Sequence, residues 1–93
     1  MSRSRKGMRA TGPNGVFEVK GQTARTLIAL IKAGAGGVTA LEVNSWAYRL
    51  GAYVHDLRRR HGLAIETQRE VHDGGWHGRY VLHSAVTLGE PTA

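Results

Sequence analysis

The stretch 48–62 constrains the fold of this chain most strongly, because its apolar and charged residues have helical spacing. Leu50, Val54 and Leu57 recur at the i, i+4, i+7 interval that places side chains on one face of a helix. The stretch ends in three arginines, a histidine and a glycine, which suit the negative end of a helix dipole and a left-handed cap. We therefore predict an amphipathic helix over residues 48–61 with a basic outer face.

The length and composition indicate one small domain with a single core. The chain has 93 residues and no cysteine, so neither a disulfide framework nor a thiolate metal site is available. Its apolar runs are shorter than the ~20 residues of a membrane span, and its first residues lack the apolar segment of a signal peptide. We expect a cytoplasmic protein that has no membrane partner.

The positive charge is unevenly distributed along the chain. The formal net charge is +6, and the first nine residues carry four of the 13 Lys and Arg residues but none of the seven Asp and Glu residues. The rest of the chain is only mildly basic, with its charge concentrated at residues 58–60. A basic tail together with one local basic patch favours a polyanionic partner such as nucleic acid.

The first third of the chain predicts an arm, a strand and a helix. Residues 1–15 have few large apolar side chains and read as a flexible basic arm, which either contacts nucleic acid or has no role. Residues 16–20 alternate as a half-buried strand does. A helix is expected over residues 24–33, with Thr23 as its N-cap and Gly34 at its end.

The remaining elements predict a helix-turn-helix followed by a hairpin. A short helix after Thr39, a turn and the long basic helix form the helix-turn-helix. Two alternating runs, 63–71 and 79–83, then flank an Asp-Gly-Gly connection that is typical of a β-hairpin. A hairpin in this position is a wing, expected at residues 72–79. Residues 84–93 read as a loose C-terminal tail.

The segments TALEVNSWAYRLGAYVHDLRRRHGLAIET and GGWHGRYVL resemble small winged-helix domain proteins of bacteria and their phages. The resemblance covers about residues 16–83 and places the chain in the winged helix-turn-helix superfamily. It implies an α+β fold with three helices, a small antiparallel sheet and a C-terminal β-hairpin wing. It also implies a capacity to bind DNA, but it supplies neither a target sequence nor a catalytic residue.

In a helix-turn-helix the second helix lies in the major groove, with its N-terminal residues nearest the bases. The long helix and the wing together supply the predicted nucleic-acid contacts, which are Tyr48, Arg49, Ala52, His55, Arg58, Arg59, Trp76, His77 and Arg79. Among these, Arg58 is expected to contact phosphate, whereas Asp56 is expected to pair with Arg59 or Arg60. Whether Trp76 touches DNA or folds back over the sheet stays open.

Catalysis and metal binding are disfavoured by the spacing of the titratable residues. His72, His77 and His83 lack the cysteine or histidine pattern of a zinc site. Glu66 and Glu70 share a strand face but would stand ~13 Å apart, beyond the separation of a carboxylate pair that acts together. We therefore expect no catalytic residue, no metal and no cofactor, and we do not expect an enzyme.

The sequence thus predicts a protein that binds double-stranded DNA, as a small transcriptional regulator or a phage-type accessory factor. Two alternatives stay open. The same fold serves as a protein-protein interaction module without DNA binding in other proteins, and winged helices also bind RNA. A homodimer and tandem binding along DNA are both compatible with a single small reading element.

Overall fold

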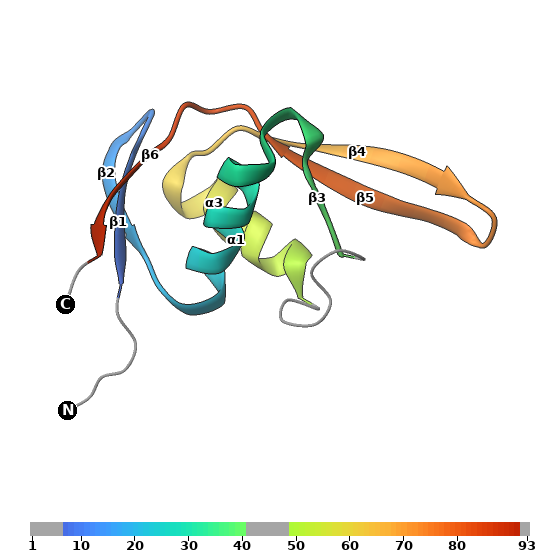
Figure 1. Cartoon of the computed structure of the whole chain (residues 1–93), viewed down its shortest axis with the longest axis horizontal. Helices are drawn as coiled ribbons and strands as arrows, with labels where there is room; N and C mark the ends of the chain where they lie inside the picture. Colours follow the sequence, from blue (N-terminus) through green and yellow to red (C-terminus); the bar gives the residue numbers. More distant parts are fainter. Residues whose placement is uncertain (1–6, 41–48, 92–93) are drawn as a thin grey trace.

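Two α-helices lie between two three-stranded antiparallel sheets in the computed structural model, which describes residues 7–40 and 49–91 (Figure 1). The strands are β1 (Met8–Gly12), β2 (Gly15–Val19), β3 (Val38–Thr39), β4 (Ile65–His72), β5 (Gly75–Leu82) and β6 (Thr87–Pro91). The helices are α1 (Gly21–Ala33), the 3-10 helix η1 (Gly34–Gly36) and α3 (Leu50–His61). The described part measures 47 × 30 × 21 Å, and its length comes from a hairpin that projects from the body.

The first sheet closes one end of the molecule and has the strand order β2-β1-β6. Ala10 and Val19 point inward from β1 and β2 and are buried in the core. The Phe17 ring stacks on the His61 ring at the end of α3, with 4.5 Å between the ring centroids. This sheet therefore packs against the C-terminal end of α3.

Strands β1 and β6 lie in segments that we expected to be a flexible arm and a loose tail. Met8, Ala10 and their neighbours do alternate, but alanine and glycine give too weak an apolar pattern to indicate a strand by themselves. Backbone hydrogen bonds stabilise β1 from both sides instead, since it lies between β2 and β6 in the sheet. The strands of the described residues therefore extend beyond residues 16–83 on both sides.

Helix α1 begins earlier than predicted and ends where predicted. Its N-cap residue is Lys20, without a side-chain cap, so Thr23 lies inside the helix and the prediction of a Thr23 cap is wrong. The Thr26 hydroxyl donates to the Gln22 carbonyl at 2.8 Å, which satisfies this buried side chain within the helix. Gly34, with φ of 55°, ends the helix, in agreement with the sequence.

Helix α3 is the long basic helix that the sequence predicted. Leu50, Val54 and Leu57 are at most 2% exposed, so the predicted apolar face is confirmed. Gly62 has a left-handed φ of 66°, and its N–H donates to the Leu57 carbonyl. The helix begins at Leu50, and the predicted first position, Tyr48, lies outside the described residues.

The expectation of three helices and one small sheet is wrong. Residues 7–40 and 49–91 contain two α-helices, one 3-10 helix and two three-stranded sheets. The short helix that we placed after Thr39 would extend into residues 41–48, which the structure does not describe. The additional sheet was missed because β1 and β6 carry few large apolar side chains.

The second sheet has the order β3-β5-β4 and contains the predicted hairpin. Strands β4 and β5 pair along their whole length, from Ile65↔Leu82 to His72↔Gly75. Strand β3 pairs with β5 at Tyr80 and Arg79. Beyond these residues the hairpin has two strands and projects from the body (Figure 1). We call the whole β4–β5 hairpin the wing; the predicted wing, residues 72–79, is its outer part.

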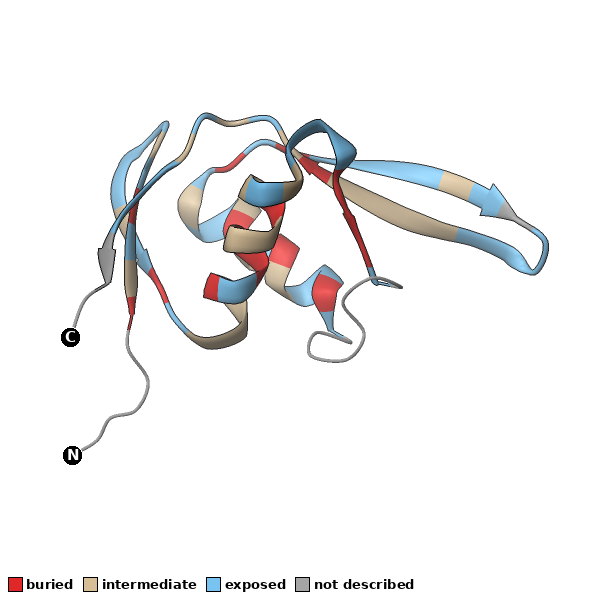
Figure 2. Ribbon diagram, in the orientation of Figure 1, coloured by how far each residue is buried: buried red, intermediate tan, exposed pale blue. Residues whose placement is uncertain are grey.

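The core lies between the two helices and the inner faces of both sheets (Figure 2). Its buried apolar side chains are Ala10, Val19, Ala24, Leu27, Leu30, Val38, Leu50, Val54, Leu57, Leu63 and Ile65. Residues 73–79 of the wing do not belong to this cluster, since they are exposed or half-buried. Among the described residues, the helices are too short and too polar to cross a membrane.

Candidate nucleic-acid interface

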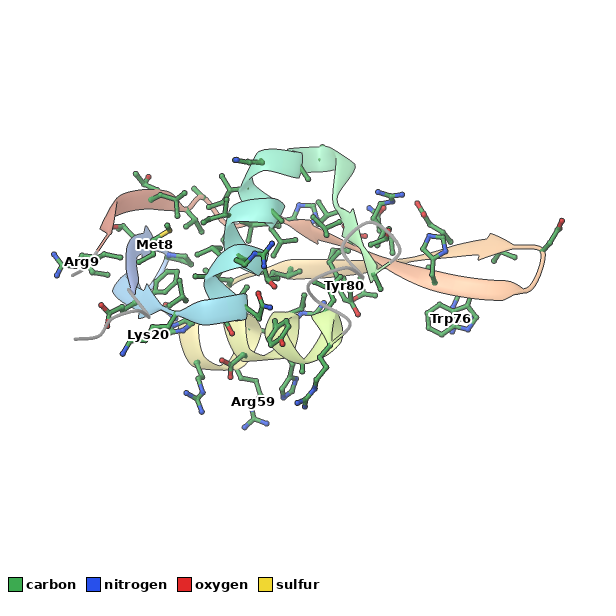
Figure 3. All side chains as sticks on the ribbon, turned by 60° about the horizontal axis from the view of Figure 1, so that its bottom comes forward. Met8, Arg9, Lys20, Arg59, Trp76 and Tyr80 are labelled. Atoms are coloured by element: carbon green, nitrogen blue, oxygen red, sulfur yellow. The ribbon has the colours of Figure 1, made fainter. Side chains whose placement is uncertain are left out.

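The outer face of α3, which we define as Ala52, His55 and Arg59, points away from the core. All three residues are exposed, and their spacing of three and four places them on the face opposite Leu50, Val54 and Leu57. Figure 3 shows the Arg59 side chain projecting from the helix into solvent. The face combines a small residue, an imidazole and a guanidinium, which are suited to close approach and to hydrogen bonding with a polyanion.

One cation beside this face, Arg60, is paired with an acidic residue. Arg60 pairs with Asp56 one turn earlier, with 3.1 Å between Nε and Oδ1, so one of the two predicted partners of Asp56 is confirmed. A shallow depression on the helix surface is lined by His55, Asp56, Arg59 and Arg60. Asp56 therefore offsets Arg60 while Arg59 adds its charge to the outer face.

Arg58 joins α3 to the wing. Its Nε and Nη2 donate to the Ile65 carbonyl at 2.9 and 2.5 Å, and Nη2 also donates to the Thr67 hydroxyl at 2.7 Å. The fork of the guanidinium allows these bonds from one side chain, which a lysine cannot reproduce. The arrangement fixes the last turn of the helix against the base of β4.

The two faces of the wing follow from its register. Facing residues on an antiparallel pair share a face, and neighbours along a strand alternate. One face carries Thr67, Arg69, Val71, Trp76, Gly78 and Tyr80. We call it the α3-side face, because Arg58 of α3 reaches Thr67 and because a Cβ at Gly51 of α3 would lie 3.5 Å from the Tyr80 hydroxyl.

The opposite face of the wing holds a network of ion pairs. Glu70 accepts from Arg79 at 2.7 and 3.2 Å and lies 2.8 Å from Nε2 of His77. Arg79 also donates to the Gly36 carbonyl at 2.8 Å, which ties the wing to η1. The hydrogen bond from Arg79, followed by that from His77, lowers the pKa of Glu70 and keeps its carboxylate charged.

A second ion pair lies nearer the base of the wing. Glu66 and Nε2 of His83 are 2.7 Å apart, and this hydrogen bond lowers the pKa of the Glu66 carboxyl. Both groups are about half exposed, so the pair contributes little to stability. With this pair, both glutamates of β4 have a basic partner on the same face of the wing: Glu66 has His83, and Glu70 has Arg79 and His77.

The α3-side face of the wing is apolar and basic instead. The guanidinium carbon of Arg69 lies 4.4 Å from the centroid of the Trp76 ring, within the range of a cation–π contact. Trp76 remains 55% exposed and Val71, directly opposite it, 81% exposed. In Figure 3 the Trp76 and Arg59 side chains project toward the same side of the molecule.

The structure divides the predicted contact residues into two groups. Ala52, His55, Arg59 and Trp76 lie on exposed surface on the α3 side of the molecule, and Arg49 is exposed at the N-cap of α3. His77 and Arg79 lie on the opposite face of the wing, bound to Glu70, and Arg58 is bound to β4. Tyr48 lies outside the described residues.

Arg69 is a candidate that reasoning from the sequence missed. The signal was present, because a two-residue turn at Asp73 and Gly74 pairs Val71 with Trp76 and puts Arg69 diagonal to the ring. We expected both Trp76 and His77 to contact nucleic acid, but adjacent residues of a strand face opposite sides. Among the described residues, no group of three His, Asp or Glu side chains is arranged to hold a metal ion.

Comparison with known proteins identifies the family of the chain. A family model described as a winged helix domain matches residues 16–92, which is most of the sequence. No curated protein and no solved structure matches the chain. The match confirms the assignment to the winged helix-turn-helix superfamily that the residues around α3 and the wing suggested. The chain is therefore a member of the winged helix domain family.

Proposed function

We propose that this protein binds double-stranded DNA, with α3 in the major groove and the wing against the adjacent backbone. The observation that carries the proposal is that the outer face of α3 and the α3-side face of the wing share one side of the molecule (Figure 3). The first carries His55 and Arg59 and the second carries Arg69, all exposed. A helix fits the major groove, and cations flanking it fit the phosphates.

The residues of α3 divide between reading and anchoring in this proposal. Ala52 and His55 lie in the first half of the helix, the part that approaches base edges in a helix-turn-helix. Arg59 lies one turn further, where a cation contacts phosphate or the O6 and N7 atoms of guanine. Arg49, at the N-cap position, is placed to contact the backbone beside the first turn.

Arg58 takes a positioning role in the proposal in place of a phosphate contact. Its guanidinium bonds with β4 set the angle between α3 and the wing, and both elements must meet one duplex together. The role that we propose for the whole chain is that of a small regulator or phage-type accessory factor in the bacterial cytoplasm. It would act by binding and not by catalysis.

Fluorescence anisotropy with a DNA duplex tests the proposal. The wild type should bind at low salt, and the logarithm of its association constant should fall linearly with the logarithm of the salt concentration. Arg59→Ala should weaken binding to all duplexes and reduce the salt slope by roughly one. Lys32→Ala, which removes an exposed cation from the last turn of α1, is the matched control and should leave both values unchanged.

His55→Ala tests the reading role separately. The variant should bind mixed-sequence duplexes as the wild type does, but should discriminate less between a duplex obtained by selection from a random pool and its scrambled version. Failure of the wild-type protein to bind any duplex at low salt would overturn the proposal. A partner captured in a salt-insensitive complex that survives nuclease treatment would then favour the protein-interaction alternative.

A further inference from the structure

Trp76 and Val71 form an exposed apolar pair on the outer part of the wing. They face each other across β4 and β5, with 55% and 81% of their surfaces exposed. Strand β3 ends its pairing with β5 at Arg79, and Trp76 lies three residues further out, or about 10 Å along the strand. At this distance from the core cluster, the indole ring does little to stabilise the fold.

The tryptophan ring is held in place by a cation. The guanidinium of Arg69 covers it at 4.4 Å from the centroid, and Gly78, the neighbour on the same face of β5, has no side chain. The ring is therefore oriented by Arg69 and still open to solvent over half of its surface. An aromatic side chain that is already held in one orientation loses less conformational entropy on stacking against a partner than a freely rotating side chain does.

The charges around the Trp76 ring favour a polyanion as its partner. None of the six residues of the α3-side face is acidic, and Arg69 adds a positive charge beside the ring. The carboxylates of β4, Glu66 and Glu70, are on the opposite face, paired with His83 and with His77 and Arg79. An exposed aromatic ring next to a cation, on a strand face that has no carboxylate, matches the π-face of a nucleobase beside its phosphate.

We propose that Trp76, supported by Arg69, acts as a wedge that stacks on a base and opens one base step of the bound duplex. The inference rests on the proposed DNA binding and names the substrate within that class: a duplex with a weakened step, such as a bulge or mismatch. Unstacking a step costs free energy, and the cost is least where stacking is already impaired. A wedge therefore binds such a duplex more tightly than a fully paired one.

The fold predicts where the weakened step should lie. The Tyr80 hydroxyl lies near the start of α3, 3.5 Å from where a Cβ at Gly51 would stand, and Trp76 is four residues away along β5, or about 13 Å. For a wing that lies along the duplex, this length corresponds to about four base pairs at ~3.4 Å each. The opened step is therefore expected about four base pairs from the first turn of α3.

Binding to two matched duplexes tests the wedge. One is a short, fully paired duplex of mixed sequence, and the other is the same duplex with a single-nucleotide bulge and 2-aminopurine next to it. The wild type should bind the bulged duplex about tenfold more tightly, and 2-aminopurine emission should change on binding as its stacking partner changes. Trp76→Ala should lose the preference and the emission change, and Trp76→Phe should retain both in part.

The control and the outcomes separate this inference from the proposed function. Lys32→Ala should keep the preference, and circular dichroism should show that Trp76→Ala folds, since the ring is exposed in the wild type. Equal binding of both duplexes by the wild type, without an emission change, would overturn the wedge and leave duplex binding intact. An equal loss for both duplexes in Trp76→Ala would also overturn it, by making the ring a general contact. No binding to either duplex would overturn the proposed function itself.

Discussion

Replacing Arg58 with alanine should destabilise the fold while leaving the number of phosphate contacts unchanged. The side chain makes two bonds to the Ile65 carbonyl and one to the Thr67 hydroxyl. Hydrogen bonds from a charged donor contribute about 1.5–3 kcal/mol each when buried, but the two bonds to Ile65 are only partly buried and the bond to Thr67 is exposed. After discounting for solvent and for the carbonyl shared by two bonds, we expect a loss of about 2 kcal/mol in the free energy of unfolding.

Thermal denaturation followed by circular dichroism measures this loss. A domain of this size changes its Tm by about 4–8 °C for each kcal/mol, so Arg58→Ala should lower the Tm by roughly 10 °C. Arg58→Lys should recover little of the loss, because a lysine keeps the charge but lacks the fork. Thr67→Val removes only the hydroxyl acceptor and should cost about 1 kcal/mol.

The neighbouring Arg59 supplies the matched control. Arg59 is exposed on the outer face of α3, so Arg59→Ala should change stability by no more than ~0.5 kcal/mol while reducing the salt slope of DNA binding by roughly one. Arg58→Ala should show the reverse pattern. An unchanged Tm together with a reduced salt slope in Arg58→Ala would refute the positioning role and restore the phosphate contact that the sequence alone suggested.

Three further substitutions, the first with a matched glycine control, test other contacts. Gly37→Ala should cost about 1–3 kcal/mol, because φ is 71° and the new Cβ would lie 2.8 Å from a backbone oxygen of β5; Gly36→Ala, with open space around it, should cost less in the same denaturation assay. Glu70→Gln should speed amide hydrogen exchange in the wing, because Arg79 loses its carboxylate partner. Since the pKa of Glu70 is lowered, this difference should be full above pH 4.5 and should vanish as the pH falls through the lowered pKa. Burial lowers the pKa of His61, so its imidazole binds a proton more readily in the unfolded chain than in the folded one, and stability should fall as the pH drops below 6.5. His61→Phe removes the titrating group and should flatten this part of the profile of Tm against pH.

The parts of the fold that sequence reasoning predicted are those with a strong local pattern. Helix α3 has three buried aliphatic residues at helical spacing and a glycine cap, and both were read directly from the sequence. The wing has two alternating runs around an Asp-Gly-Gly connection, which fixed the hairpin. In both cases the determinant lies within about 20 residues of chain, so neighbours along the sequence decide the outcome.

Strands β1 and β6 lacked such a determinant. Their stability depends on each other, since β1 pairs with β6 across most of the length of the chain. Ala10 is fully buried, but an isolated alanine in a basic segment gives no apolar signal. Partner choice of this kind is decided by tertiary packing, which a reading of local periodicity does not include.

The roles of the candidate site residues were harder to predict than the elements that carry them. Arg58, Arg79 and His77 were predicted to contact DNA, yet the side chain of each is bound to another residue within the fold. A charged side chain near a strand carbonyl or a glutamate can bind that group or a phosphate. The strand register determines whether the group within the fold is in reach. Arg69, in contrast, was not predicted to contact DNA, yet it lies diagonally across from Trp76 on the exposed face of the wing, with its guanidinium over the ring.

The division of charge across the wing determines from which side a polyanion approaches, and the net charge of +6 does not. On the opposite face, Glu66 and Glu70 lie within hydrogen-bond distance of His83, His77 and Arg79, so a phosphate approaching there would meet carboxylates at close range. On the α3-side face, Arg69 has no acidic neighbour among the residues that share the face. These carboxylates therefore repel most strongly a polyanion that approaches their own face, where the distance is shortest and screening by salt is least. If the protein binds DNA as proposed, a duplex should therefore approach the side that carries Arg59, Arg69 and Trp76.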